Sequence, residues 1–381
     1  MPQKSEVKNR DLQVLRGIAI LLVAIFHFTW RWQDFYSWGK YVNAPWFFIT
    51  TNGVALFFMI SGWVIFSSLT RTSKLSVFTI NRMMRLAIPL LFIAPILFLF
   101  QEIFPTEVFN EVIPGQVLTS IMMINPSYLL FLFDIRTDWI TGVQWTLTYE
   151  ITFYLLSSVV FFKISKKFAF EIMFFSTNLI LVGNYLYLYL NDQIGRGYYV
   201  KDVNSPSVEY VIQQSGLLHL SWFVLGMWFF KYRSTPRDKK SWIYVMNLTF
   251  LCAWDISQGR VAFSQPKQTA FALLILIIFI VLFILIGFKP SKYKFYKIRT
   301  SLEALGNVSY EFYLLHEIIG VTILVNLSNY AILASYPEIW PLVICIVILM
   351  VYKLSYFVNK FFSIPLQTFV KAKVSNKRSK E

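Results

Sequence analysis

Arg16 and His27 stand eleven residues apart within one apolar stretch, Leu12–Trp30. In an α-helix an eleven-residue step returns almost to the same face, about 16 Å further along the axis. A guanidinium and an imidazole therefore share one face of a predicted membrane helix at two depths. Each costs about 2.5–3.5 kcal/mol or more to insert, so we first consider a functional role. The structural alternative is an arginine that extends to the interface and a hydrogen-bonded core histidine.

Glu150 is the next ionisable group at membrane depth. It lies about two turns into the predicted helix Gly142–Phe162, at a depth close to that of His27. A buried carboxylate beside an imidazole can fix its tautomer and stabilise the imidazolium. We therefore predict that Glu150 orients His27, which would act as a general base. The alternative is a structural ion pair between two helices.

Arg82 and Arg85 are spaced i, i+3, which places them on one helix face at the predicted cytoplasmic side. Two guanidinium groups so placed are able to clamp a phosphate. The alternative is that they only anchor the inner end of a helix. Ser61 precedes Gly62 at mid-membrane, where the pair permits a kink or a close backbone approach. We favour packing for Ser61, because the sequence directs no base toward it.

His316 is expected at mid-membrane in the predicted helix Leu305–Ser328, with Tyr313 on the neighbouring helix surface. It either orients a substrate or is a satisfied core histidine. The chain has only three histidines and two cysteines, and none of them are clustered at metal-ligand spacing. We therefore predict no metal site.

The composition indicates an all-α polytopic membrane protein. Of the 381 residues, 56% are apolar and only 14% are charged, whereas a soluble domain averages about 25% charged. The net charge of +15 is spread over short loops between apolar spans, which argues against a nucleic-acid partner.

Ten apolar windows predict membrane-spanning helices, most of them of about 17–25 residues. They are Leu12–Trp30, Trp46–Leu69, Leu86–Phe104, Gly142–Phe162, Phe168–Leu190, Gln214–Phe230, Trp242–Trp254, Thr269–Phe288, Leu305–Ser328 and Pro337–Val358. A further apolar stretch, Val117–Phe133, is interrupted by Asn125-Pro126. For that stretch we predict an interfacial or re-entrant part of an external loop.

The basic residues predict the orientation of these helices. With a cytoplasmic N-terminus, 25 of the 35 Lys and Arg residues fall in segments placed inside and 7 fall outside. This alternation supports ten spans with both termini cytoplasmic. We predict one transmembrane domain over residues 1–365 and a basic cytoplasmic tail over residues 366–381, beside anionic lipid.

Four segments, in order and spread along the chain, share the pattern of a known family. They are Arg16–His27 with its Arg-x10-His spacing, Phe57-Phe58-Met59-Ile60-Ser61-Gly62-Trp63, Arg82-Met83-Met84-Arg85 with Pro89, and Trp145-Thr146-Leu147-Thr148-Tyr149-Glu150 with Phe153-Tyr154. Weaker agreement is found in Phe223–Gly226 and in Leu305–Tyr310 leading to His316. Together they resemble the acyltransferase 3 family of integral-membrane O-acyltransferases, which modify bacterial surface glycans and some other acceptors.

The resemblance implies transfer of an acyl group, with acetyl as the first candidate, from cytoplasmic acyl-CoA to a hydroxyl of a glycan or its lipid-linked precursor. O-antigen, capsule, exopolysaccharide and peptidoglycan remain open as acceptors. Acyl-CoA would be a co-substrate, and we expect no tightly bound cofactor. Catalysis would fall to His27, as base or transient acyl carrier, and to Glu150. Phosphates would bind Arg16, Arg82 and Arg85, and supporting or acceptor-side roles would fall to Ser61, Trp145, Tyr310, Tyr313 and His316.

The chain departs from the family pattern in two places. Many members read Glu-Glu-Gln after the Trp-Ser-Leu segment, whereas here only Glu150 remains, followed by Ile151 and Thr152. Some members also carry an extracytoplasmic hydrolase-like domain after the last helix. We therefore expect that any second transfer step outside is made by a separate protein, or that the helices perform the whole reaction.

The resemblance implies a location in the bacterial cytoplasmic membrane. Two other classes of function remain open. One is a transporter or flippase for an anionic or glycan-bearing substrate, in which Arg, His and Glu form a substrate or proton path. The other is a scaffold in a glycan-assembly machine. The sequence shows no inverted repeat of broken helices, which counts against a transporter.

Overall fold

The computed structural model describes residues 4–42, 50–109, 111–190, 212, 214–233, 238–257, 266–288, 296–330 and 335–378. The predicted all-α fold is confirmed, and no strand occurs among these residues. Six helices in this part of the chain are long and apolar enough to cross a membrane. The protein is therefore a polytopic membrane protein, while the number of ten spans and the cytoplasmic termini stay predictions.

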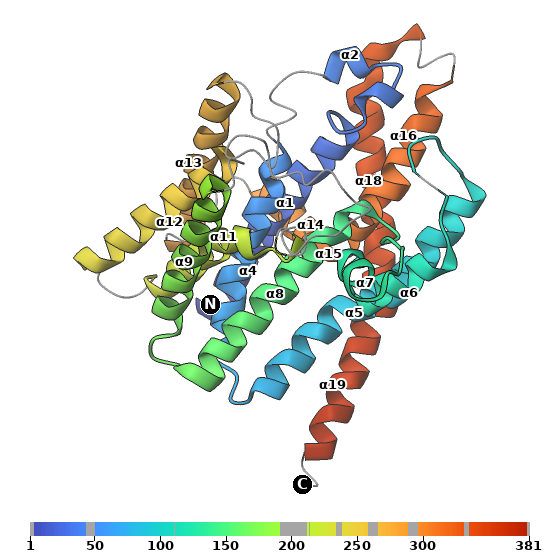
Figure 1. Ribbon diagram of the computed structural model, residues 1–381. Helices are drawn as coiled ribbons and strands as arrows, with labels where there is room; N and C mark the ends of the chain where they lie inside the picture. Colours follow the sequence, from blue (N-terminus) through green and yellow to red (C-terminus); the bar gives the residue numbers. More distant parts are fainter. Residues whose placement is uncertain are drawn as a thin grey trace.

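The helices form one bundle (Figure 1). The α-helices are α1 Lys4–Phe28, α2 Gly39–Val42, α4 Gly53–Leu69, α5 Leu75–Ile103, α6 Pro114–Met122, α7 Pro126–Phe133, α8 Trp145–Val159, α9 Ala169–Leu190, α11 Leu220–Lys231, α12 Lys239–Ser257, α13 Pro266–Phe288, α14 Tyr296–Asn307, α15 Ser309–Leu315, α16 Val321–Ser328, α18 Trp340–Val358 and α19 Ile364–Arg378. Wider π-helical turns occur at η4 Val160–Ile164, η6 His316–Gly320 and η8 Asn359–Ser363. Each of the ten predicted ranges overlaps a helix. Residues 46–49 of the second range lie outside the described residues.

Two helix boundaries differ from the predictions. The helix predicted from Leu86 begins at Leu75, so Arg82 and Arg85 lie inside α5 rather than at its start. The last helix does not end at Val358 but continues through η8 into α19, which makes the predicted tail helical up to Arg378. Hydropathy marks the part of a helix at membrane depth, whereas residues with good helix propensity can extend the helix beyond it without a hydropathy signal.

The stretch Val117–Phe133 is broken where Asn125-Pro126 predicts an interruption. Helices α6 and α7 meet there at 103°. The Asn125 side chain accepts a hydrogen bond from the Ser127 backbone N–H at 2.9 Å and so caps α7. Pro126 occupies the first turn, where no N–H donor is needed. The pair is a broken or re-entrant element, as its sequence predicts.

Helices α1 and α14 approach each other through two glycines. A Cβ on Gly17 would lie 2.0 Å from the Leu302 carbonyl oxygen, and one on Gly306 would lie 1.9 Å from the Gln13 carbonyl oxygen. Small residues allow such backbone contact in membranes, where packing rather than the hydrophobic effect joins helices. Two ion pairs, Arg10–Glu303 and Asp11–Arg299, also join these two helices.

Helices α4 and α11 are joined in the same way. A Cβ on Gly62 would lie 1.8 Å from the Phe223 carbonyl oxygen, and one on Gly226 would lie 1.9 Å from the Met59 carbonyl oxygen. Phe58 stacks on Phe223 with ring centroids 4.6 Å apart. The close approach expected at Ser61-Gly62 is therefore present, and it fixes the face of α4 that carries Ser61.

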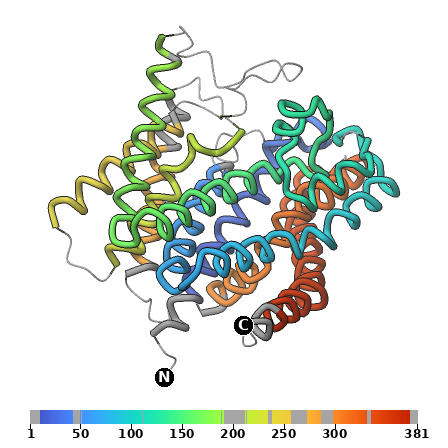
Figure 2. The backbone as a smooth tube through the Cα atoms, turned by 60° about the horizontal axis from the view of Figure 1, so that its bottom comes forward, coloured from blue at the N-terminus to red at the C-terminus, as the bar shows by residue number. Residues whose placement is uncertain are grey.

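Helices α1 and α4 lie in the middle of the bundle, between α9, α11, α12 and α13 on one side and α5, α16 and α18 on the other (Figure 1). Figure 2 shows α5 running beside α8. The buried segment α15–η6–α16 contacts both α1 and α18. This arrangement brings α1, α4, α5, α8 and α15 around one interior space.

Candidate functional site

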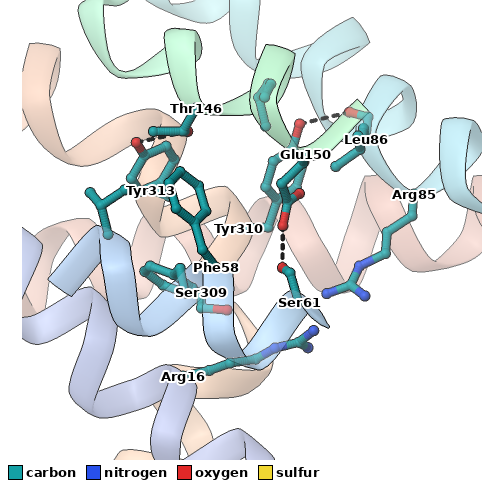
Figure 3. Close-up of a pocket in the computed structure, with 13 residues that line it drawn as sticks. Arg16, Phe58, Ser61, Arg85, Leu86, Thr146, Glu150, Ser309, Tyr310 and Tyr313 are labelled. Atoms are coloured by element: carbon teal, nitrogen blue, oxygen red, sulfur yellow. Dashed lines mark hydrogen bonds between the residues drawn. The ribbon is translucent and has the colours of Figure 1, made fainter. Parts of the chain in front are cut away.

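A cavity lies between these five helices (Figure 3). It contains about 580 Å³ not filled by protein atoms, including its open mouth. The lining is mostly apolar, with polar and charged groups from all five helices. The polar and charged lining residues are Arg16, Ser61, Arg85, Thr146, Glu150, Ser309, Tyr310 and Tyr313. A largely apolar pocket with a few convergent polar groups is the usual form of a small-molecule site.

Arg16 and Arg85 direct their guanidinium groups into the same part of the cavity, next to Ser61 (Figure 3). Arg16 makes one long hydrogen bond of 3.4 Å to Gln13 Oε1. Two guanidinium groups facing one space repel each other and attract an anion. Because guanidinium binds phosphate through two parallel hydrogen bonds, this end of the cavity suits a phosphate-bearing ligand.

Glu150 lies in this cavity and not at His27. One carboxylate oxygen accepts a hydrogen bond from the Ser61 hydroxyl, and the other accepts one from the Tyr154 hydroxyl at 3.0 Å. The predicted contact between Glu150 and His27 is therefore wrong, because depth along a helix does not fix the direction in which a side chain points. The carboxylate instead offsets part of the positive charge of Arg16 and Arg85. Its catalytic role stays a prediction.

Tyr310 holds the helix that carries Arg85. Its hydroxyl donates a 3.0 Å hydrogen bond to the Leu86 carbonyl oxygen. Pro89 stands in the same turn of α5, where it removes one backbone hydrogen bond. The contact therefore ties α15 to a weakened turn of α5 and fixes Arg85 relative to the cavity.

A second cluster surrounds His27, further along α1. His27 Nδ1 lies 2.9 Å from the Val23 carbonyl oxygen and 3.3 Å from His316 Nε2. His316 Nδ1 lies 2.8 Å from the Tyr313 carbonyl oxygen. Since a carbonyl only accepts, we assign the proton to Nδ1 on both rings. His27 Nε2 is then an unprotonated base, and His316 is a buried histidine with a partner at each nitrogen.

Glu317 faces His27 Nε2. Its Oε1 lies 3.6 Å from that nitrogen, and its Oε2 accepts a 3.2 Å hydrogen bond from the Thr141 hydroxyl. The two side chains of this pair are only 12% and 6% exposed. The π-helical turn His316–Gly320 widens the helix and lets two consecutive side chains approach α1. Such turns are frequent at functional sites.

Glu317 is the residue that the sequence analysis missed. The signal was present, because a carboxylate within an apolar span is costly and calls for a functional hypothesis. The residues predicted in the helix Leu305–Ser328 were Tyr310, Tyr313 and His316, and Glu317 directly follows the last of them.

Tyr313 separates the two clusters. Its ring lines the cavity, and its hydroxyl donates to the Val143 carbonyl oxygen and accepts from the Thr146 hydroxyl, both at 3.0 Å. Its backbone carbonyl accepts the hydrogen bond from His316. One residue thus forms the wall of the cavity and fixes the histidine behind it.

Arg82 and Trp145 do not line the cavity. Arg82 lies over the Phe78 ring, 5.6 Å from its centroid. The Trp145 ring packs edge-on against Tyr149 at 5.0 Å. Of the ten residues predicted for the site, six line the cavity and two form the histidine cluster, while these two stand outside both.

Comparison with known proteins identifies the family of the chain that carries these clusters. Residues 9–359 match a family model described as an acyltransferase domain. The chain belongs to the acyltransferase 3 family. This acyltransferase is also 27% identical over 175 residues to nodulation protein 10 of Rhizobium leguminosarum bv. viciae. That match covers 40% of the chain and 44% of the relative, less than half of either. No solved structure matches the acyltransferase.

Proposed function

We propose that this membrane acyltransferase moves an acyl group, acetyl being the first candidate, from cytoplasmic acyl-CoA to a hydroxyl of a cell-surface glycan or its lipid-linked precursor. One observation carries the proposal. Helix α1 presents Arg16 to a cavity with a second arginine and presents His27 to a buried carboxylate, about 16 Å apart along the axis. The membrane would be the bacterial cytoplasmic membrane.

Acyl-CoA would bind with its phosphates at Arg16 and Arg85. The extended pantetheine arm is long enough to cover the distance from there to His27, and Tyr313, which separates the cavity from the two histidines, would move aside to admit it. Arg82, which lies on α5 next to the Phe78 ring, remains a candidate for the part of the nucleotide outside the cavity. Ser61 and Glu150 would border the arm inside the cavity.

His27 supplies the base for the transfer. Its Nε2 removes the proton from the acceptor hydroxyl while that oxygen bonds to the thioester carbon. The carbon–sulfur bond then breaks, and the sulfur leaves with the electron pair and takes the proton from Nε2. In the alternative path Nε2 attacks the thioester carbon, and the sulfur leaves with the carbon–sulfur electron pair. The acceptor hydroxyl then takes the acyl group from Nε2, and its proton goes to the CoA thiolate. A separate extracytoplasmic transferase would act only if the first product is an intermediate carrier.

The proposal is tested by transfer from radiolabelled acetyl-CoA to the surface polysaccharide of the host, meaning the bacterium that produces the protein. Membranes with the protein should label the polysaccharide, and membranes without it should not. If neither sample labels it, labelled succinyl-CoA and longer acyl-CoA are offered next. Uptake or export of a glycan without dependence on any acyl-CoA would contradict the proposal and favour a transporter.

Arg16→Ala is expected to raise the KM for acyl-CoA about 10- to 100-fold, the loss of one or two charge-assisted hydrogen bonds to phosphate. The kcat should change much less, because Arg16 lies about 16 Å from the base. Arg16→Lys keeps the positive charge but not the planar pair of donors, so its KM for acyl-CoA should lie between those of the wild type and Arg16→Ala.

Arg71→Ala is the matched control for this change. Arg71 is an exposed arginine that donates to the Ser67 carbonyl oxygen, outside the cavity. It should leave the KM for acyl-CoA unchanged. An unchanged KM in Arg16→Ala would count against a phosphate role for that residue.

A further inference from the structure

We propose that the acceptor hydroxyl binds in the gap between His27 Nε2 and Glu317 Oε1, and that Glu317 is the second catalytic group of the transfer. This inference rests on the proposed function and deepens it. The gap of 3.6 Å is too long for a direct hydrogen bond. An oxygen atom can nevertheless lie about 2.8 Å from both atoms, within hydrogen-bond distance of each.

Neither of the two atoms that border this gap carries a proton to donate into it. Val23 and His316 both accept from the His27 Nδ1–H, so Nε2 presents a lone pair. The facing carboxylate oxygen of Glu317 is also an acceptor. A hydroxyl placed between these two acceptors carries a single proton, so it donates to one of them. In the proposed site it donates to Nε2, the base that removes this proton, and its oxygen lies beside the Glu317 carboxylate.

Thr141 fixes the carboxylate from the opposite side. Its hydroxyl donates to Glu317 Oε2, which leaves Oε1 for the gap. Thr141 directly precedes η3 Gly142–Gln144, at the end of the segment that follows α7. A Cβ on Gly142 would lie 3.1 Å from Oε2, so the backbone also closes on this oxygen. The carboxylate is thus held in one orientation.

Two other carboxylates near α15, the half-buried Glu150 and the buried Glu311, are engaged elsewhere. Glu150 is engaged by Ser61 and Tyr154 in the cavity. Glu311 accepts a 2.8 Å hydrogen bond from Asn359 on the side of η8. Glu317 is therefore the carboxylate that meets the imidazole.

Glu317 keeps its charge through the reaction. The acceptor O–H bond breaks as Nε2 gains the proton, and the hydroxyl oxygen bonds to the thioester carbon. The carbon–sulfur electron pair leaves with the sulfur of CoA, which then takes the proton from Nε2. While the proton is on His27, the carboxylate faces an imidazolium, and this attraction exists in the transition state but not before it.

The test compares Glu317→Gln with Glu317→Asp in transfer from labelled acetyl-CoA to the host polysaccharide. Glu317→Gln keeps the shape and should lower kcat about 100-fold or more, with the KM for acetyl-CoA within about twofold. Glu317→Asp restores the charge and should regain at least about tenfold of that loss. A residue that only supported the fold would change stability in both variants without this split.

If Glu317→Gln does not accumulate as folded protein, a second pair of variants tests the role of Glu317. Thr141→Val removes the hydroxyl that holds Glu317 and should lower kcat about fivefold to tenfold, the value of one hydrogen bond. Thr141→Ser retains the hydroxyl and should match the wild type. Glu311→Gln is the matched control for a buried carboxylate on the same segment, and its kcat should stay within about twofold of wild type.

Two results overturn the assignment of Glu317 while the proposed function stands. In the first, the wild type is active and Glu317→Gln retains a kcat within about threefold of it. Glu317 is then not the second catalytic group, and the proposed function still holds. The other is equal loss in Glu317→Gln and Glu317→Asp, which removes the role of the charge. A wild type that transfers no acyl group overturns the proposed function first, and the assignment with it.

Discussion

His27→Ala is expected to reduce acyl transfer about 1,000-fold or more while acyl-CoA still binds. The variant removes the base, whereas Arg16, which would hold a phosphate, lies about 16 Å away along α1. It also leaves Glu317 without the imidazole that it faces at 3.6 Å. Transfer is measured with labelled acetyl-CoA and host polysaccharide, and binding is measured separately with the purified protein.

His219→Ala is the control for loss of a buried histidine. His219 Nδ1 lies 2.8 Å from Asp255 Oδ2, and Trp222 Nε1 donates to the same oxygen at 2.7 Å. This cluster joins α11 to α12, so we expect lower thermal stability but nearly unchanged kcat per folded molecule. Transfer at the wild-type rate in His27→Ala would remove His27 from the mechanism.

The same protein distinguishes the two chemical paths. When labelled acetyl-CoA is supplied without an acceptor, an acyl-histidine path leaves label on the wild-type protein and none on His27→Ala. Direct transfer leaves both unlabelled. The first result makes Nε2 the nucleophile, and the second leaves it as the base.

Gly62→Ala is expected to destabilise the folded protein by about 3 kcal/mol or more. The added Cβ would lie 1.8 Å from the Phe223 carbonyl oxygen, and this backbone atom cannot move without separating α4 from α11. Gly226→Ala meets the Met59 carbonyl oxygen at 1.9 Å and should have the same effect. Size-exclusion profiles in detergent after heating measure the loss.

Gly183→Ala is the matched control, because a Cβ at this position of α9 has no atom within 4 Å. Alanine there should leave stability unchanged or raise it slightly, since it favours a helix by about 1 kcal/mol over glycine. Equal stability of Gly62→Ala and Gly183→Ala would contradict the packing of α4 against α11.

The sequence was sufficient for the fold class and for the position of most helices. Apolar windows locate the membrane segments because the bilayer demands long apolar helices with satisfied backbones. The break at Asn125-Pro126 was also predictable, since Asn caps a helix and Pro occupies its first turn. The beginning of α5 at Leu75 was not, because polar helical turns outside the bilayer carry no hydropathy signal.

The candidate site was predictable only in part. Arg16, Ser61, Arg85 and Glu150 were among the predicted site residues and line one cavity, whereas the contact of His316 with His27 and the hydrogen bond of Ser61 to Glu150 were not predicted. The partner of His27 was assigned to Glu150 from depth alone. Depth follows from counting residues, but direction follows from helix tilt and rotation, which depend on how neighbouring helices pack.

Helix α1 sets a fixed distance between Arg16 and His27. Arg16 and His27 lie on one uninterrupted helix without proline, so their spacing is set by the backbone and cannot adapt to the ligand. Every CoA thioester has the same length from phosphate to carbonyl carbon, and on the proposed function each would present that carbon at the same height beside His27. Only the acyl chain extends beyond the level of His27. The residues around His27 would then select among acyl groups, and the arginines would recognise only the CoA part of the donor.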